Sequence, residues 1–342
     1  MQSSKFILVS WGTTNYCPLR CPHCYRDASR RLPDELSTQE ARRLIEQIAD
    51  LKARILVFSG GEPLAREDIV ELVRYAHEQG LLPALATSGL LVNERIVRDL
   101  ASAGLRYVAI SLDSHVPEKH DRFRGVSGLW KKVVDSVRMF VDQGVEVQLN
   151  FTMTVENVED LEGVVKLCED LNVKYLHVFD LVPVGRATET WRRLKLSTLQ
   201  VIERCLSVMK REDLNVDVKP TCIPQFWPYV MIREPELWNR LRTRHAPGCI
   251  AGRRYLYVSP TGDVYPCPYL PYVIGNVRSR SLLDIVSSSG IISALERREL
   301  KGKCRSCRYV DICGGCRAKA YALKGDLLDE DPDCPLRTIG QS

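Results

Sequence analysis

Three cysteines near the start of the chain have the type and spacing for metal chemistry. Cys17, Cys21 and Cys24 stand in the run C-P-L-R-C-P-H-C-Y. Three thiolates at this spacing hold three corners of a 4Fe–4S cube and leave the fourth iron open. Because CxxC loops also serve zinc and thiol redox sites, the spacing alone does not fix the metal, and His23 would complete a zinc site. The third cysteine and the preceding strand favour a cluster.

Ten of the thirteen cysteines fall into two groups, three at 17–24 and seven at 249–334. The second group contains the run C-x2-C-x5-C-x2-C and comprises Cys249, Cys267, Cys304, Cys307, Cys313, Cys316 and Cys334. A zinc ribbon is the alternative for this group taken alone. Of the other cysteines, Cys168 and Cys205 stand in apolar helical patterns and are expected in the core. Cys222 has no assigned role.

The bulk composition indicates a metal-binding protein of a reducing compartment. The 342 residues suffice for one large domain and a smaller one, and 45% are hydrophobic. No apolar stretch approaches 18 residues, and the N-terminal apolar run is too short for a signal peptide, so we expect a cytoplasmic protein without a membrane partner. The net charge of +5 is mild, and the paired arginines lack interleaved aromatics, so no nucleic-acid partner is expected.

Strands and helices alternate from residue 5 to about residue 180. Strands are expected at Lys5–Trp11, Arg54–Phe58, Leu82–Thr87, Arg106–Leu112, Val145–Thr152 and Lys174–Phe179. Helices are expected between them, and the first opens with a capping box at Ser37 and Glu40. Six βα units with right-handed crossovers imply parallel strands. The predicted fold class is therefore α/β, with a partial (β/α)6 barrel.

Glycines and polar residues follow the ends of these strands. They are Cys17–Cys24, Gly60-Gly61-Glu62-Pro63, Thr87-Ser88-Gly89, Ser111 with Asp113, Asn150 with Thr152, and Gly185-Arg186. Because chemistry in parallel sheets lies beyond the carboxyl ends of the strands, this placement predicts one active site. We expect the barrel at residues 1–190, a helical bridge at 191–248 and a cysteine-rich domain at 249–342. That domain opens with a predicted hairpin over Tyr255–Ser259 and Val264–Cys267.

Five landmarks, taken in order, resemble the radical S-adenosylmethionine (SAM) enzymes that carry a C-terminal SPASM-type auxiliary-cluster domain. They are C-P-L-R-C-P-H-C-Y-R-D at 17–27, S-G-G-E-P at 59–63, T-S-G at 87–89, I-S-L-D at 110–113 and the cysteines from 249 to 334. The resemblance spans nearly the whole chain. It implies SAM bound at the open iron and a 5′-deoxyadenosyl radical that abstracts hydrogen from an unactivated C–H bond.

The resemblance also implies the residues that bind SAM. Gly60 and Gly61 let the backbone approach the methionine moiety, and Gly61 and Glu62 receive its amino group. Tyr25 presents backbone groups to the adenine. Further candidates for the ribose, the methionine end or the carboxylate are Ser88, Ser111, Asp113 and Arg186. The ordinary alternative for each polar candidate is a strand-end side chain that satisfies backbone groups.

One or two auxiliary 4Fe–4S clusters are implied by the same resemblance. One would be held by the set Cys304, Cys307, Cys313 and Cys334, and the other by the set Cys249, Cys267 and Cys316. The fourth position of the latter is left open for substrate, for Cys222 or for a non-cysteine residue. A single auxiliary cluster, with some cysteines unused, is the alternative.

Additional segments resemble the tetrapyrrole-modifying branch of the family. They include W-G-T-T-N-Y-C, H-D-R-F-R-G at 120–125, L-V-P-V-G-R at 181–186 and K-P-T-C-I-P-Q-F at 219–226. This resemblance implies removal of acetate side chains from 12,18-didecarboxysiroheme to give iron-coproporphyrin III, in heme biosynthesis. Alternatives are oxidative decarboxylation of iron-coproporphyrin III propionates to heme, a dioxo-heme step, a peptide or tungsten-cofactor maturase, and a non-catalytic scaffold. A low-potential donor such as ferredoxin or flavodoxin is the implied redox partner.

The sequence specifies the substrate contacts less sharply. Candidate arginines for the substrate carboxylates are Arg122, Arg124, Arg253 and Arg254, with surface arginine as the alternative for each. Histidines expected near the active face are His23, His177 and His245, and those expected at the surface are His77 and His120. No residue is assigned as a catalytic acid or base.

Overall fold

The sheet is the frame of the molecule. The computed structural model describes residues 6–336, so Lys5 of the first predicted strand lies outside the described residues. Ten strands form one sheet in the order β10-β9-β8-β1-β2-β3-β4-β5-β6-β7. They are β1 Leu8–Thr14, β2 Ile55–Gly60, β3 Leu82–Thr87, β4 Tyr107–Ser111, β5 Glu146–Met153, β6 Tyr175–Asp180, β7 Asp217–Thr221, β8 Tyr255–Val258, β9 Asp263–Tyr265 and β10 Gly275–Asn276.

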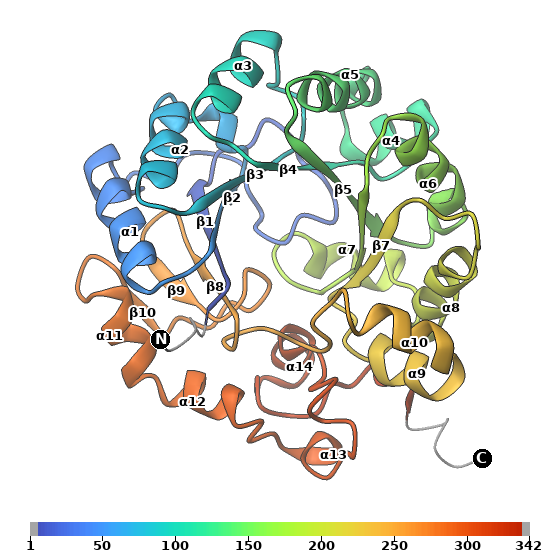
Figure 1. Cartoon of the computed structure of the whole chain (residues 1–342). Helices are drawn as coiled ribbons and strands as arrows, with labels where there is room; N and C mark the ends of the chain where they lie inside the picture. The colour runs from blue at the N-terminus through green and yellow to red at the C-terminus, as the bar shows by residue number, and fades with distance from the viewer. Residues whose placement is uncertain (1–5, 337–342) are drawn as a thin grey trace.

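Helices connect successive strands and cover the outside of the sheet (Figure 1). Those of the barrel and its extension are α1 Thr38–Asp50, α2 Ile69–Glu78, α3 Glu94–Ser102, α4 Pro117–Arg124, α5 Leu129–Asp142, α6 Leu161–Asp170, α7 Ala187–Leu194, α8 Thr198–Met209, α9 Phe226–Arg233 and α10 Pro235–Leu241. The C-terminal region adds α11 Leu282–Ser288, α12 Gly290–Glu296, α13 Gly302–Arg305 and α14 Arg317–Lys324. The capping box predicted for the first helix is present, because Ser37 and Glu40 cap each other's backbone at the start of α1.

The parallel part of the sheet confirms the partial barrel and extends it. Strands β1 to β6 pair in parallel in sequence order, as predicted. A seventh parallel strand, β7, pairs with β6 within the segment for which only helices were expected. Pro220 concealed this strand in the sequence. Because β7 is the last strand of the sheet, the missing N–H of Pro220 faces no further ladder, which is where proline is tolerated.

The C-terminal region is joined to the barrel through the sheet. The predicted hairpin is present as β8 and β9, which pair antiparallel. Strand β8 also pairs in parallel with β1, with Leu8 opposite Tyr255 and Trp11 opposite Val258. The first strand of the chain therefore lies inside the sheet, between β2 and β8. In Figure 1 the orange and red C-terminal segment lies beside the strands at the open side of the barrel.

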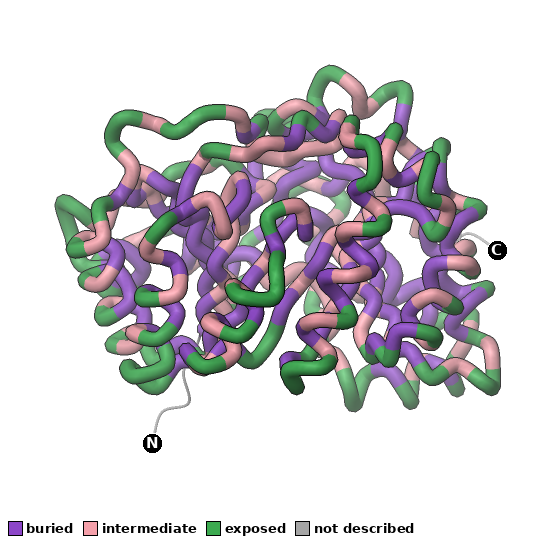
Figure 2. The backbone as a smooth tube through the Cα atoms, turned by 90° about the horizontal axis from the view of Figure 1, so that it is seen from above, coloured by how far each residue is buried: buried purple, intermediate pink, exposed green. Residues whose placement is uncertain are grey.

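Strand β5 shows how the sequence separates core from cavity. Its side chains alternate between buried and partly exposed positions along the strand. Val147, Leu149 and Phe151 are buried in the hydrophobic core, whereas Asn150 and Thr152 line the interior cavity. This alternation follows from the two-residue period of a strand. Figure 2 shows the resulting buried interior inside a shell of exposed loops and helix surfaces.

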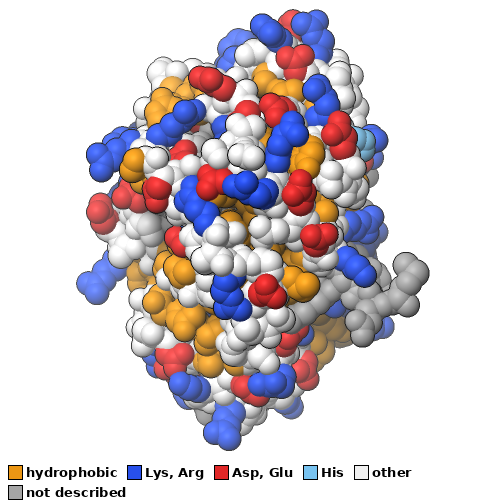
Figure 3. Space-filling model, turned by 90° about the vertical axis from the view of Figure 1, so that its left-hand side faces the viewer, with side chains coloured by type: hydrophobic (Ala, Val, Ile, Leu, Met, Phe, Trp, Pro, Cys, Tyr) orange, Lys and Arg blue, Asp and Glu red, His pale blue; other side chains and the backbone are white. Residues whose placement is uncertain are grey.

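The surface carries mixed charge. On the face shown in Figure 3, Lys and Arg side chains are interspersed with Asp and Glu. Within residues 6–336, no helix is long and apolar enough to cross a bilayer.

Candidate functional site

A cavity of about 600 Å³ occupies the interior of the barrel. This volume is within the range of roughly 300–1,000 Å³ that is usual for small-molecule sites. Its walls bring together side chains from both ends of the sequence. Cysteines in its lining are Cys17, Cys21, Cys24, Cys222, Cys249, Cys267 and Cys316. The structure therefore places the N-terminal cysteine loop and part of the C-terminal group around one space.

The loop that carries the first three cysteines follows β1. The N–H of Cys24 donates to the carbonyl of Cys21 at 3.2 Å, which closes the CxxC turn. Arg186 fixes this loop by donating to the carbonyls of Cys21 and Ala28, both at 2.9 Å, and by pairing with Asp27 at 2.9 Å. The Arg186 guanidinium is thus directed at the loop, and this residue is absent from the cavity lining.

The glycine pair after β2 lies against the same loop. A Cβ on Gly61 would stand 2.1 Å from the carbonyl oxygen of Tyr16, and one on Gly60 would stand 2.6 Å from that of Thr14. Both glycines line the cavity, as does Ser88. These positions therefore require glycine because two backbone segments meet there, before any cofactor is considered.

Glu62 is fully buried behind the glycines. Its carboxylate accepts hydrogen bonds from the Thr87 hydroxyl at 2.7 Å, from the Ser88 backbone at 2.9 Å and from the Ser88 hydroxyl at 2.5 Å. It joins the ends of β2 and β3 and is absent from the cavity lining. Its predicted contact with the SAM amino group remains a prediction.

A buried ion pair lies beside the cysteine loop. Asp113 accepts from Arg124 at 2.7 Å and from the backbone N–H of Thr152 at 2.9 Å. Burial opposes ionisation of Asp113, but the Arg124 charge, together with smaller contributions from His23, His120 and the Thr152 N–H, lowers the pKa of the carboxyl. Arg124 also directs a guanidinium nitrogen at the Cys21 sulfur, 3.9 Å away. The backbone N–H of Asp113 donates to His120, which is fully buried, so the expectation of a surface position for His120 was wrong.

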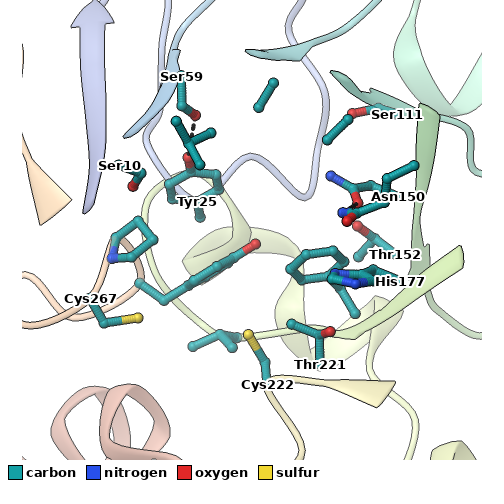
Figure 4. Close-up of a pocket in the computed structure, with 18 of the residues that line it drawn as sticks. Ser10, Tyr25, Ser59, Ser111, Asn150, Thr152, His177, Thr221, Cys222 and Cys267 are labelled. Carbon is teal, nitrogen blue, oxygen red and sulfur yellow. Dashed lines mark hydrogen bonds between the residues drawn. The ribbon is translucent and has the colours of Figure 1, made fainter. Parts of the chain in front are cut away.

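His23 faces the cavity from within the cysteine loop. Its ring stacks on Phe123 at a centroid distance of 4.6 Å. Burial lowers the pKa of His23 to about 4, so the imidazole is neutral at neutral pH. Tyr25, two residues further on, projects into the centre of the cavity and its hydroxyl lies 3.5 Å from that of Ser59 (Figure 4).

Cys222 joins the C-terminal cysteines on the opposite side of the cavity. Figure 4 shows the Cys222 and Cys267 side chains on the same side of the space, below Tyr25. Burial and the neighbouring thiolates of Cys316, Cys267 and Cys249 raise the pKa of Cys222 well above its usual value. Cys222 has a φ of 63°, a left-handed conformation uncommon for a residue with a Cβ. All four cysteines line the cavity, and the charges of the other three act on Cys222.

The remaining C-terminal cysteines form a separate group. Burial raises the pKa of the Cys313 thiol most strongly, and the nearby charges of Cys334 and Cys304 raise it further. The N–H of Cys307 donates to the carbonyl of Cys304 at 3.4 Å, a CxxC turn like that of the N-terminal loop. The two groups are adjacent, because the N–H of Cys249 donates to the Cys313 carbonyl at 2.8 Å.

The donors around these sulfurs fit iron–sulfur clusters. Gly315 directs its N–H at the Cys313 sulfur at 3.4 Å, and Arg317 directs a nitrogen at the Cys304 sulfur at 3.9 Å. Arg317 is fully buried and also donates to the carbonyls of Leu327 and Asp329. Hydrogen bonds to sulfur and burial are the features that set cluster potentials. Among residues 6–336, no group of three or more His, Cys, Asp or Glu side chains is placed so that it could hold a single metal ion.

Comparison with known proteins agrees with this arrangement. Residues 11–168 match the radical SAM superfamily, and residues 249–308 match an iron–sulfur cluster-binding domain of the SPASM type. An AdoMet-dependent heme synthase of Methanosarcina barkeri is 34% identical over 338 residues, covering 96% of each chain. The chain belongs to the radical SAM superfamily. An Fe-coproporphyrin III synthase of the same organism is 29% identical over 354 residues, covering 96% of this chain and 88% of that protein.

Solved structures support the fold. SuiB of Streptococcus suis, bound to S-adenosylmethionine, superimposes with a TM-score of 0.77 at 19% identity, covering 97% of this chain and 78% of SuiB. As a radical SAM protein with a SPASM domain, this chain uses SAM, a 4Fe–4S cluster and auxiliary iron–sulfur clusters.

Several predicted residues lie away from the cavity. The SAM candidates absent from its lining are Glu62, Asp113 and Arg186, whereas Tyr25, Gly60, Gly61, Ser88 and Ser111 line it. Of the arginines suggested for substrate carboxylates, Arg124 lines the cavity but is engaged by Asp113, and Arg122, Arg253 and Arg254 do not line it. Sequence reasoning missed Lys219, which lines the cavity from β7. Its signal was the polar–apolar alternation of D-V-K-P-T, interrupted by Pro220.

Proposed function

We propose that this protein is an enzyme of heme biosynthesis that converts iron-coproporphyrin III to heme by oxidative decarboxylation of propionate side chains. The observation that carries the proposal is the 34% identity to an AdoMet-dependent heme synthase over 96% of both chains. The acetate-removing activity predicted first from the sequence corresponds to the Fe-coproporphyrin III synthase, which is 29% identical. The comparison therefore favours the alternative that the sequence ranked second.

The cavity supports a reaction at a buried side chain. It joins the Cys17–Cys24 loop to the Cys222, Cys249, Cys267 and Cys316 group within one enclosed space. SAM and its cluster, when bound, supply the 5′-deoxyadenosyl radical that removes a hydrogen atom from the substrate. Each propionate then loses carbon dioxide, becomes a vinyl group and releases one electron. The barrel walls would exclude water from the substrate radical before it loses carbon dioxide.

The chain's own residues have distinct parts in this proposal. Cys17, Cys21 and Cys24 would hold the SAM cluster, and Gly60 and Gly61 would give SAM close access to the backbone. Arg186 would fix the cysteine loop through its two carbonyl contacts. The contacts of Glu62 with the Ser88 backbone and hydroxyl would hold the ends of β2 and β3 beside the cofactor.

The auxiliary clusters would have eight cysteine ligands. We propose that Cys222 supplies the fourth thiolate to the set Cys249, Cys267 and Cys316, because all four line the cavity and the charges of the other three act on Cys222. The second set would be Cys304, Cys307, Cys313 and Cys334. Cys222, Cys249, Cys267 and Cys316 would hold a cluster that would supply a one-electron acceptor for the decarboxylation. A low-potential donor such as ferredoxin or flavodoxin would supply the electron for the SAM cluster.

The test is an anaerobic assay of the reconstituted protein with SAM, dithionite and iron-coproporphyrin III. We expect 5′-deoxyadenosine and heme, with the mass loss of propionate-to-vinyl conversion. In a parallel reaction, 12,18-didecarboxysiroheme should remain unchanged. Loss of acetate from that substrate would overturn the proposal in favour of the deacetylation, and modification of a peptide with both tetrapyrroles untouched would favour a maturase.

A further inference from the structure

A row of polar side chains crosses four neighbouring strands at one level of the barrel. Ser111 on β4 is the register partner of Asn150 on β5, which is opposite His177 on β6, which is opposite Lys219 on β7. All four residues line the cavity. Figure 4 shows the side chains of Ser111, Asn150 and His177 pointing into the same space. We refer to these four residues as the polar row.

Lys219 is the charged member of the polar row. Within residues 6–336, its ammonium group has no hydrogen bond or ion pair, although the residue is more than half buried. Burial lowers the pKa of Lys219, as expected for a cation removed from water. The nearby carboxylate of Asp217 is engaged by His245 at 2.9 Å. The other strong cation of the lining, Arg124, is already paired with Asp113.

The other members of the polar row are neutral and offer donors. Burial, and then the Lys219 charge, lower the pKa of His177 to about 3, so its imidazole is uncharged at neutral pH. The side-chain oxygen of Asn150 accepts from Gln148 at 2.6 Å, which leaves its NH2 group directed elsewhere. In the described part of the chain, neither this NH2 group nor the Ser111 hydroxyl has a hydrogen-bond partner. One buried cation beside neutral donors matches the chemistry of a carboxylate.

We propose that the polar row of Ser111, Asn150, His177 and Lys219 is a subsite for a substrate carboxylate, with Lys219 as its counter-ion. The inference rests on the proposed function, in which the substrate carries several propionates. A propionate seated there would orient the macrocycle within the barrel. Lys219 would then be a binding and positioning residue, with no part in the bond-breaking step.

The test compares binding of iron-coproporphyrin III and of its neutral methyl ester to the anaerobic holoenzyme, followed by the porphyrin absorbance. Lys219→Met should weaken binding of the acid about tenfold or more, as expected for a lost charged hydrogen bond. Lys219→Arg should restore much of it. The ester should bind the wild type and Lys219→Met alike. Lys166→Met, which removes the same charge from the exposed face of α6, is the matched control and should bind as the wild type does.

Two results separate this inference from the proposed function. If the wild type fails to bind iron-coproporphyrin III, the proposed function and the inference both fail. If the wild type binds and both Lys219→Met and Lys219→Gln bind with unchanged affinity, the carboxylate subsite alone is refuted. Iron content and the far-ultraviolet circular dichroism spectrum of each variant show that a lower affinity does not come from misfolding.

Discussion

At the scale of single residues, the thiol of Cys222 is the most informative side chain outside the two cysteine groups of the sequence. It follows β7, has a left-handed backbone and lies with three cysteines that come from a region more than 25 residues further along the chain. A strained conformation held next to a cavity is typical of functional positions. No cysteine spacing connects Cys222 to Cys249, because the fold brings these two residues to one cavity from separate parts of the chain.

We expect Cys222→Ala to change the electron paramagnetic resonance spectrum of the reduced protein and to lower bound iron by up to about four atoms per chain, one cluster's content. The control is Cys205→Ala on α8, which removes a fully buried thiol from the hydrophobic core, away from the cavity. Unchanged spectra and iron content in Cys222→Ala would show that this residue is not a ligand.

Gly61 provides a second prediction at the residue scale. Gly61→Ala places a methyl group 2.1 Å from the Tyr16 carbonyl oxygen, so the cysteine loop and β2 must separate. Overpacking of this kind costs about 1–3 kcal/mol in the free energy of unfolding, measured by urea titration. Gly290→Ala, at a position with no atom within 4 Å of the new methyl group, should cause no loss. Equal stability of the two variants would contradict the steric argument.

At the scale of elements, the sequence predicted most of the barrel and missed its last strand. The six strands predicted from the sequence are found in the expected order and pair in parallel as expected. Strand β7 was missed because Pro220 is read locally as a breaker, whereas its tolerance depends on β7 being an edge. Because β7 was not predicted, Lys219 was not included in the candidate site. The CxxC turns were predictable from the spacing of the cysteines. The contacts of Arg186 with the cysteine loop and of Glu62 with the end of β3 were not, because they form between residues far apart in the sequence.

Helix α1 allows a pH prediction at this scale. Glu40 accepts a 2.6 Å hydrogen bond from Arg278, which follows β10, and also caps the start of its own helix. The Arg278 contact, followed by the Ser37 backbone, lowers the pKa of Glu40 to about 2. Because the folded-state pKa is the lower one, this stabilisation is complete above the unfolded value of about 4.3 and is lost as the pH falls towards 2.

Glu40→Gln should therefore lower stability at pH 6 and reduce the loss of stability between pH 5 and pH 2. Urea unfolding at a series of pH values measures both effects. Glu67→Gln, at an exposed position before α2, serves as the control. An unchanged pH profile in Glu40→Gln would mean that the contact with Arg278 does not persist in solution.

At the scale of the whole molecule, a buried ion pair fastens the C-terminal region to the barrel. Lys319 on α14 donates to Asp180 at the end of β6, and both side chains are at most 3% exposed. The two residues are joined across the boundary between the barrel and the SPASM-type region. Removal of one partner leaves a buried charge without its counter-ion.

Lys319→Met should lower the free energy of unfolding by about 3–5 kcal/mol. The double variant Lys319→Met with Asp180→Asn should recover part of this loss, because the buried charge of Asp180 is then removed, whereas Asp333, 3.6 Å from Lys319, still loses its lysine partner. Urea titrations of the single and double variants form the cycle that measures the coupling. Strict additivity of the two single changes would indicate that the pair does not connect the two regions energetically.

The pairing of β1 with β8 has a consequence for how the chain is made. Strand β1 leaves the ribosome before the other strands of this sheet, and its second neighbour, Tyr255–Val258, is synthesised some 240 residues later. Until then one hydrogen-bonding edge of β1 stays bare, and bare edges recruit other strands. A nascent or prematurely terminated chain of this protein is therefore the form most prone to aggregation. Pairing of β8 with β1 removes the free edge.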